Sequence, residues 1–76
     1  MKTIEVIVSF SNGRIIPRRV RYYCEALAEY KVSDIMDIYY EERVGNTIRY
    51  SVKLKEEERD ALILFSSMAN QWFLVH

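Results

Sequence analysis

Apolar side chains recur at every second position from Ile4 to Phe10, and Ile7 is the one apolar residue among the intervening positions. A period of two with the apolar residues on one face is typical of a half-buried β-strand. The alternation breaks at Ser11-Asn12-Gly13, where Asn-Gly supplies the positive backbone angles of a hairpin turn, and a basic second strand follows. A three-residue loop at 11–13 is expected because it matches the facing side chains, pairing Val8 with Ile16, Ile4 with Val20, and Glu5 with Arg19.

Pro17 limits where this second strand can lie. Proline has no backbone N–H to donate to a ladder, so the strand is expected at an edge or with a bulge near its start. Alternation turns Arg18 toward the core between Ile16 and Val20. A buried guanidinium needs a partner, so Arg18 should reach past the sheet edge or meet a carboxylate.

A second alternation runs from Ile48 to Leu54, directly after the segment Gly45-Asn46-Thr47. The residues from Asp37 to Val44 are interpreted as its partner strand, which predicts another hairpin. A three-residue loop at 45–47 would make the facing pairs apolar, with Val44 opposite Ile48, Tyr40 opposite Val52, and Ile38 opposite Leu54.

Residues 24–39 allow two interpretations. Glu25 to Glu29 consists of good helix formers, and six apolar residues fall on one helical stripe: Cys24, Ala28, Val32, Ile35, Met36 and Tyr39. The following hairpin pattern argues for extended chain instead. We therefore expect a loop or one helical turn at 25–29 and strands beyond it.

Two final strands are predicted at Ala61–Phe65 and Gln71–Val75, after a charged, solvated connection at 55–60. Both are apolar on both faces, which indicates a central place in a closed barrel or a surface covered by another chain. The 76 residues are expected to form one all-β domain of five or six short antiparallel strands, as a curled sheet or SH3-like open barrel. The alternative is an α+β fold with one helix over about 24–39.

Composition argues against an enzyme. Eleven basic and eleven acidic residues give a net charge of zero, and the chain has one histidine, His76, and one cysteine, Cys24. The histidine is the last residue, where a general base or metal ligand is poorly oriented. Adjacent Glu41 and Glu42 point to opposite faces of a strand, and Glu56-Glu57-Glu58 is interpreted as solvated charge. No cofactor, metal or small-molecule substrate is expected.

The lone cysteine cannot form an internal disulfide, and neither a signal-peptide pattern nor an apolar run of about 20 residues is present. A reduced, cytoplasmic setting without a membrane partner is expected.

The basic residues are the first candidate site. Alternation places Arg19, Arg21 and Tyr23 on one outer face, and a second set on the outer face of the second hairpin. If these faces adjoin, they form a curved positive surface with aromatic rings, suited to a phosphate backbone and stacked bases. The competing interpretation is ordinary surface pairing, with Arg19 facing Glu5. The second set comprises Tyr39, Arg43, Arg49 and Lys53.

The last two strands give the second candidate site. Trp72, Phe73 and Met68 would make a protein-binding anchor together with Ile63 and Phe65, because aromatic residues dominate interface hot spots. Core packing is the more common fate of a single Trp.

Several strand motifs carry a resemblance to a known family. The motifs are Pro17-Arg18-Arg19-Val20-Arg21-Tyr22, Tyr30-Lys31-Val32 with Ile35, Met36 and Tyr39, Arg49-Tyr50-Ser51-Val52, Leu62-Ile63-Leu64-Phe65, and Gln71-Trp72-Phe73-Leu74. Together they resemble small bacterial all-β domains of unknown function, related to the C-terminal module of ImuB-type proteins, the non-catalytic Y-family polymerase relatives. This chain departs from them at Tyr22 and Tyr39, where that group carries Trp, and at the longer turn 24–29. The resemblance implies a β-rich module without known catalytic activity, linked to DNA repair.

Two non-enzymatic functions follow from these patterns. The first is a module for protein interaction or self-association, with a protein partner or homodimer. The alternative is a module that binds single-stranded DNA or RNA. Zero net charge and the two-sided apolar strands favour the first.

Overall fold

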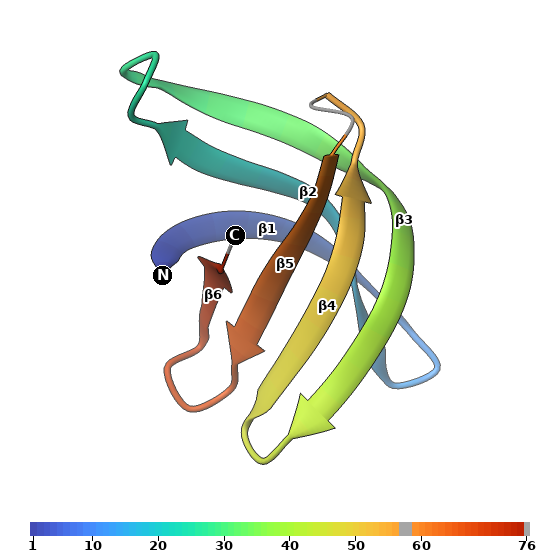
Figure 1. Cartoon of the computed structure of the whole chain (residues 1–76). Helices are drawn as coiled ribbons and strands as arrows, with labels where there is room; N and C mark the ends of the chain where they lie inside the picture. The colour runs from blue at the N-terminus through green and yellow to red at the C-terminus, as the bar shows by residue number, and fades with distance from the viewer. Residues whose placement is uncertain (57–58, 76) are drawn as a thin grey trace.

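The computed structural model describes residues 1–56 and 59–75, and in this part of the chain it forms six antiparallel strands (Figure 1). Neighbouring strands follow chain order, and pairing of the first with the last closes a barrel. The all-β prediction is thereby confirmed. The strands are β1 Lys2–Ser11, β2 Arg14–Cys24, β3 Glu29–Val44, β4 Thr47–Leu54, β5 Arg59–Ser66 and β6 Gln71–Leu74.

The alternative with a helix over 24–39 is wrong, since the described residues contain no helix. Aromatic and β-branched residues are dense from Tyr30 to Tyr40, and such side chains favour extended backbone. The helix formers occupy only a four-residue turn at 25–28, closed by the Ala28 N–H donating to the Glu25 carbonyl at 3.3 Å.

The three-residue loop expected in the first hairpin is wrong. Ser11 pairs with Arg14 around a two-residue Asn12-Gly13 turn, whose φ values of 52° and 75° fit a type I′ turn. A bulge at Arg18 then shifts the ladder, so that buried Val20 faces Val6. The predicted bulge near Pro17 is thus confirmed. Its extra residue shifts the pairing by one position, which removes the mismatch of apolar and polar residues that a two-residue loop alone would produce.

The bulge also overturns the expected inward direction of Arg18. The side chain is exposed and its Nε donates to the Ser9 hydroxyl at 2.8 Å. An extra residue in one strand re-aims the side chain, and here it keeps a guanidinium out of the core.

The second hairpin differs from expectation in the same way. Val44 pairs with Thr47 around Gly45-Asn46, with Gly45 at a φ of 58°. Two irregularities in β3, at Met36 and Tyr39, move the register again. The observed pairs are Ile38 with Val52, Tyr40 with Ser51, and Ile35 with Leu54.

The core lies inside the barrel and consists mainly of the inward rows of β4 and β5. Val52, Leu54 and Ile63 have no exposed surface, and Tyr50 has 1%. Trp72 stacks on the Tyr50 ring with centroids 5.7 Å apart and lies 5.0 Å from Phe65. The remaining core members are Ile4, Val20, Tyr22, Ile48, Ala61 and Leu74.

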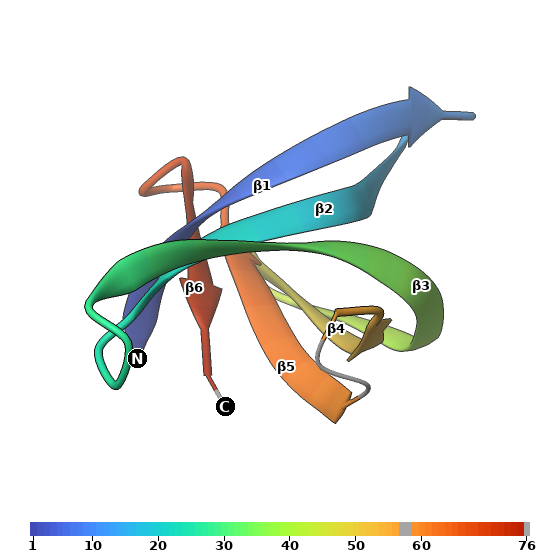
Figure 2. The ribbon, with the colours of Figure 1, turned by 90° about the horizontal axis from the view of Figure 1, so that it is seen from above.

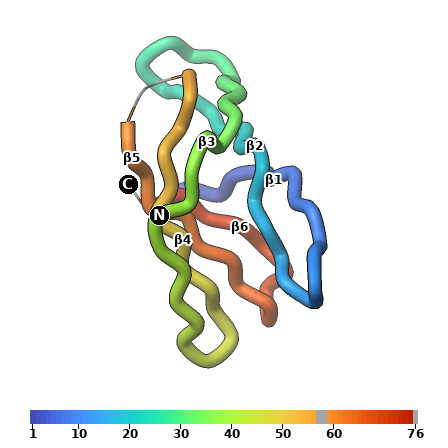
Figure 3. Tube along the Cα trace, turned by 90° about the vertical axis from the view of Figure 1, so that its right-hand side faces the viewer, coloured from blue at the N-terminus to red at the C-terminus, as the bar shows by residue number. Residues whose placement is uncertain are grey.

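Several strands are longer than the segments by which they pair with their neighbours in the barrel. β3 bends, pairing with β2 over Glu29–Asp34 and with β4 over Ile35–Val44. The β2–β3 turn and the β3–β4 turn lie at opposite ends of the molecule, and the β1–β2 turn lies to one side (Figure 3). The molecule measures 36 × 24 × 17 Å. The end of the β1–β2 hairpin extends away from β6 (Figure 2), and we call residues 6–18 the arm.

Candidate interaction surface

The outer side of β1, β2 and the first half of β3 forms one continuous surface, here named the three-strand face. Val6, Val20 and Ser33 lie opposite one another on the inner side of three adjacent strands. Because side chains alternate along a strand, the residues before and after each of them point outward. The three-strand face comprises Glu5 and Ile7 from β1, Arg19, Arg21 and Tyr23 from β2, and Tyr30, Val32 and Asp34 from β3.

Both arginines of this face are paired with carboxylates. Arg21 Nη1 donates to Glu5 Oε1 at 2.6 Å, and Arg19 Nε donates to Asp34 Oδ1 at 2.6 Å. The expected surface pairing is therefore present, but the prediction that Arg19 faces Glu5 is wrong because the Arg18 bulge shifts the register. These four charges sum to zero.

Aromatic rings fix the position of Arg21. Its guanidinium carbon lies 4.2 Å from the centroid of the Tyr30 ring, and Tyr23 meets Tyr30 edge to face at 5.3 Å. A guanidinium held by a carboxylate and an aromatic face loses little further side-chain entropy when it contacts a partner. Arg21 thus makes both of these contacts at the centre of the face.

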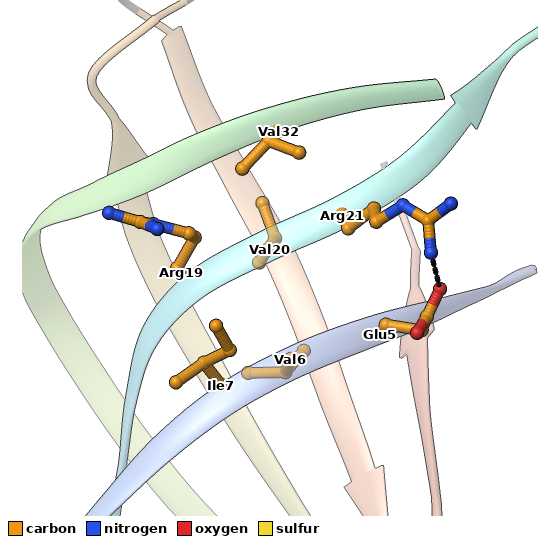
Figure 4. A pocket seen from close by; sticks show the side chains of 7 residues that line it. All are labelled: Glu5, Val6, Ile7, Arg19, Val20, Arg21 and Val32. Carbon is orange, nitrogen blue, oxygen red and sulfur yellow. Dashed lines mark hydrogen bonds and ion pairs between the residues drawn. The ribbon is translucent and has the colours of Figure 1, made fainter. Parts of the chain in front are cut away.

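A hollow of about 330 Å³ lies on this surface beside Arg21 (Figure 4). Ile7 and Val32 contribute apolar walls from β1 and β3, the two strands that flank β2, and they are 61% and 49% exposed. The lining contains one carboxylate, Glu5, and no histidine, cysteine or hydroxyl side chain. The hollow offers contact area for a partner side chain, without a nucleophile for covalent chemistry.

The second basic set lies on a different part of the barrel. Arg49 Nη1 is 4.0 Å from Glu42 Oε1, and Lys53 pairs in register with Asp37 on one side and Asp60 on the other. Arg43 does not share their face, because it lies opposite buried Ile48 on the inner side of β3.

Tyr39 is exposed at its bulge. Partial desolvation, then the nearby Asp60 carboxylate, raises the pKa of Tyr39. An acidic neighbour makes this tyrosine a poor platform for a phosphodiester.

The two basic sets do not merge into one cationic surface. Arg19 and Arg21 border the first half of β3, whereas Arg49 and Lys53 border its second half. Asp34 lies at the end of the first half, beside Arg19. The chain thus carries two separate patches, of which the first is charge-balanced and the second has one more carboxylate than cations.

The C-terminal anchor candidates divide between core and surface. Ile63 is fully buried, and Phe65 and Trp72 pack against the core, so these three do not form an exposed anchor. Phe73 alternates to the outer side, opposite Leu64 and Thr3, and is half-buried. Met68, in the β5–β6 turn, is 81% exposed.

Residues considered for catalysis remain apart. Glu41 accepts a hydrogen bond from Arg14 Nη2 at 2.8 Å, while Glu42 accepts one from the Tyr40 hydroxyl at 3.0 Å. The described residues hold no cluster of three metal-ligating side chains. His76, Glu57 and Glu58 lie outside the described residues.

The sequence patterns missed Tyr30 and Val32 as members of the site. A four-residue turn at 25–28 would have set them opposite Tyr23 and Arg21, as observed. The helix-forming composition of that turn obscured the pairing.

No family model, curated protein or solved structure matches this chain. The described residues also contain no helix long and apolar enough to cross a membrane.

Proposed function

We propose that this chain is a non-catalytic protein-interaction module that contacts another protein chain through the three-strand face. The observation that carries this proposal is the composition of the face, where ion-paired arginines alternate with exposed apolar and aromatic side chains. Tyrosine and arginine are enriched among the residues that dominate protein interfaces.

Charge balance supports a protein partner. Binding to a nucleic-acid backbone depends on cations that neutralise phosphates and release counterions. Arg19 and Arg21 already neutralise Asp34 and Glu5 at 2.6 Å, so contact with phosphate would compete with existing pairs.

A single-stranded nucleic-acid module is the second candidate. It is favoured by one observation, the guanidinium of Arg21 over the Tyr30 ring beside Tyr23, because bases stack on such rings. The link to DNA repair implied by the family resemblance belongs to this candidate.

The experiment compares the immobilised wild-type chain with the double variant Tyr30→Ser/Val32→Lys in an extract of the source cells treated with nuclease. Met68→Ser is the matched control, because Met68 is highly exposed and lies in the β5–β6 turn rather than on the three-strand face. Circular dichroism verifies that all three chains are folded.

The proposal expects proteins retained by wild type and by Met68→Ser, lost with the double variant, and unchanged between about 0.1 M and about 0.5 M salt. Equal retention by all three chains contradicts it. A labelled oligothymidine that binds and weakens about thirty-fold over this salt range, as expected for three phosphate contacts, and is lost in Arg21→Ala would favour the nucleic-acid candidate instead.

A further inference from the structure

β1 is longer than the strand that closes the barrel against it. β1 spans Lys2–Ser11, but its ladder with β6 covers only Lys2–Ile4. β6 begins at Gln71, one residue before Trp72. Because Trp72 pairs with Ile4, Gln71 lies beside Glu5. The other side of β1 pairs with β2. In the described part of the chain no strand pairs with the remaining backbone edge of residues 6–11, which we call the free edge of β1 (Figure 2).

Unpaired strand edges are templates for another strand, and proteins commonly protect them with prolines, bulges and charged side chains. The open segment of β2 has all three, since it contains Arg14, Pro17 and the bulged Arg18. The second half of β3 carries two irregularities and acidic residues, and the start of β5 carries Arg59 and Asp60.

The free edge of β1 has none of these devices. Its sequence Val6-Ile7-Val8-Ser9-Phe10-Ser11 contains no charge, proline or glycine, and the bulged residue of this hairpin lies on β2. Ile7 is 61% and Phe10 is 74% exposed. Uncharged segments of high β-propensity with an open edge pair readily with other strands.

We propose that a second copy of this chain adds to the free edge of β1 in antiparallel orientation, with Ser9 of the two copies facing each other on a two-fold axis. Gln71 occupies the position beside Glu5, so the added strand must begin beyond it. Centring on Ser9 sets Ile7 opposite the partner's Ser11 and Val8 opposite the partner's Phe10. Residues on the same side of each strand meet, as an antiparallel pair requires.

The features of the edge select a second copy over an unrelated strand. Val8 and Phe10 lie on the inner side of β1, and pairing covers each exposed Phe10 with the partner's Val8. No charged residue lies within the paired segment, and the net charge of the chain is zero, so two copies do not repel. An isologous contact of this kind closes on itself and stops at two copies.

This inference rests on the proposed function, since both are protein association, but it uses the strand edge rather than the three-strand face. Sedimentation equilibrium from about 10 μM to about 1 mM is the first test. The apparent mass of 9.1 kDa should rise toward twice that value with concentration. Ile7→Lys should raise the dissociation constant by about tenfold or more, because a lysine blocks an edge. Val32→Lys, on the same face but on β3, should leave it unchanged.

Cross-linking tests the register. In a Cys24→Ser background, Ser9→Cys should form a disulfide between copies under mild oxidation, because directly opposed residues lie within bonding reach. Ser11→Cys is the matched control. Position 11 pairs with Ile7 in the proposed register, so the two introduced thiols would be roughly 13 Å apart along the strand and should not bond.

A wild-type chain that stays monomeric throughout the series overturns the strand pairing but leaves the proposed function standing, since retention of another protein is measured separately. Equal loss of association in Ile7→Lys and Val32→Lys also overturns it, by indicating contact through the three-strand face. Cross-linking of the Ser11→Cys variant in preference to the Ser9→Cys variant overturns the register.

Discussion

Tyr50 on β4 donates a hydrogen bond from its hydroxyl to the backbone carbonyl of Ile15 on β2, at 2.8 Å. Tyr50 is 1% exposed and stacks on Trp72 inside the barrel. Ile15 belongs to the arm, beyond the residues of β2 that pair with β3. One core side chain therefore ties the arm to the barrel, together with the Arg14–Glu41 ion pair at 2.8 Å.

Removing this hydroxyl should weaken the whole domain. Tyr50→Phe keeps the ring and loses the hydrogen bond, so the free energy of unfolding should fall by about 1 kcal/mol. Tyr40→Phe is the control, because its hydroxyl bonds Glu42 at the surface, and its change should stay within about 0.5 kcal/mol. Urea unfolding measures both, and equal losses would show that the buried hydroxyl has no special role.

Tyr50 should also make stability fall at alkaline pH. Burial, then the Glu41 carboxylate, raises the pKa of Tyr50 above its ordinary value of 10.0. The folded protein thus holds the phenolic proton more tightly than the unfolded chain. This contribution is complete below about pH 10 and is lost as pH rises through the raised pKa.

The measurement is the stability gap between wild type and Tyr50→Phe from about pH 8 to about pH 11. The gap should narrow as pH rises, because only wild type loses the contribution of Tyr50. The pKa values of Tyr39 and Tyr40 are raised too, but both proteins share those residues. A gap that stays constant would contradict the prediction.

The Glu5–Arg21 pair should contribute little to stability. Both side chains are well exposed, so the 2.6 Å contact is screened by solvent and salt. A double-mutant cycle of Glu5→Ala and Arg21→Ala should give a coupling free energy of about 0.2–1 kcal/mol that shrinks at high salt. A coupling above about 2 kcal/mol would mean that the face is held together by charge rather than by the sheet beneath it.

The all-β class was predictable because apolar residues recur at every second position in both Ile4–Phe10 and Ile48–Leu54. The registers were not, because they depend on bulges at Arg18, Met36 and Tyr39. Pro17 indicates a bulge near the start of β2 but not how far it shifts the pairing, and Met36 and Tyr39 carry no comparable signal.

The site was partly predictable for the same reason. Alternation placed Arg19, Arg21 and Tyr23 on one outer face, as observed. Their partners Glu5 and Asp34 depend on the shifted registers, so the charge balance of the face became visible only in three dimensions.

The turn between β2 and β3 offers a stabilising substitution. Ala28 has a φ of 53°, in the left-handed region that costs a residue with a Cβ roughly 1–2 kcal/mol. Ala28→Gly should raise the free energy of unfolding by up to about 1 kcal/mol, after the entropy cost of glycine. Ala26→Gly, in the same turn but without a positive φ, should be neutral or destabilising. Thermal unfolding decides, and a larger gain at Ala26 would contradict the assigned strain.

Ile63 and Met68 were both expected from the sequence at a protein interface. Truncating Ile63 should lower the stability of the domain strongly, whereas truncating Met68 should hardly change it. Ile63 has no exposed surface and contributes to the core cluster, so Ile63→Ala should lower the free energy of unfolding by about 2–5 kcal/mol. Met68 is 81% exposed, so Met68→Ala should change it by no more than about 0.5 kcal/mol. Chemical denaturation of the two variants side by side checks this. A stable, fully folded Ile63→Ala would mean that the inward row of β5 is not the centre of the core.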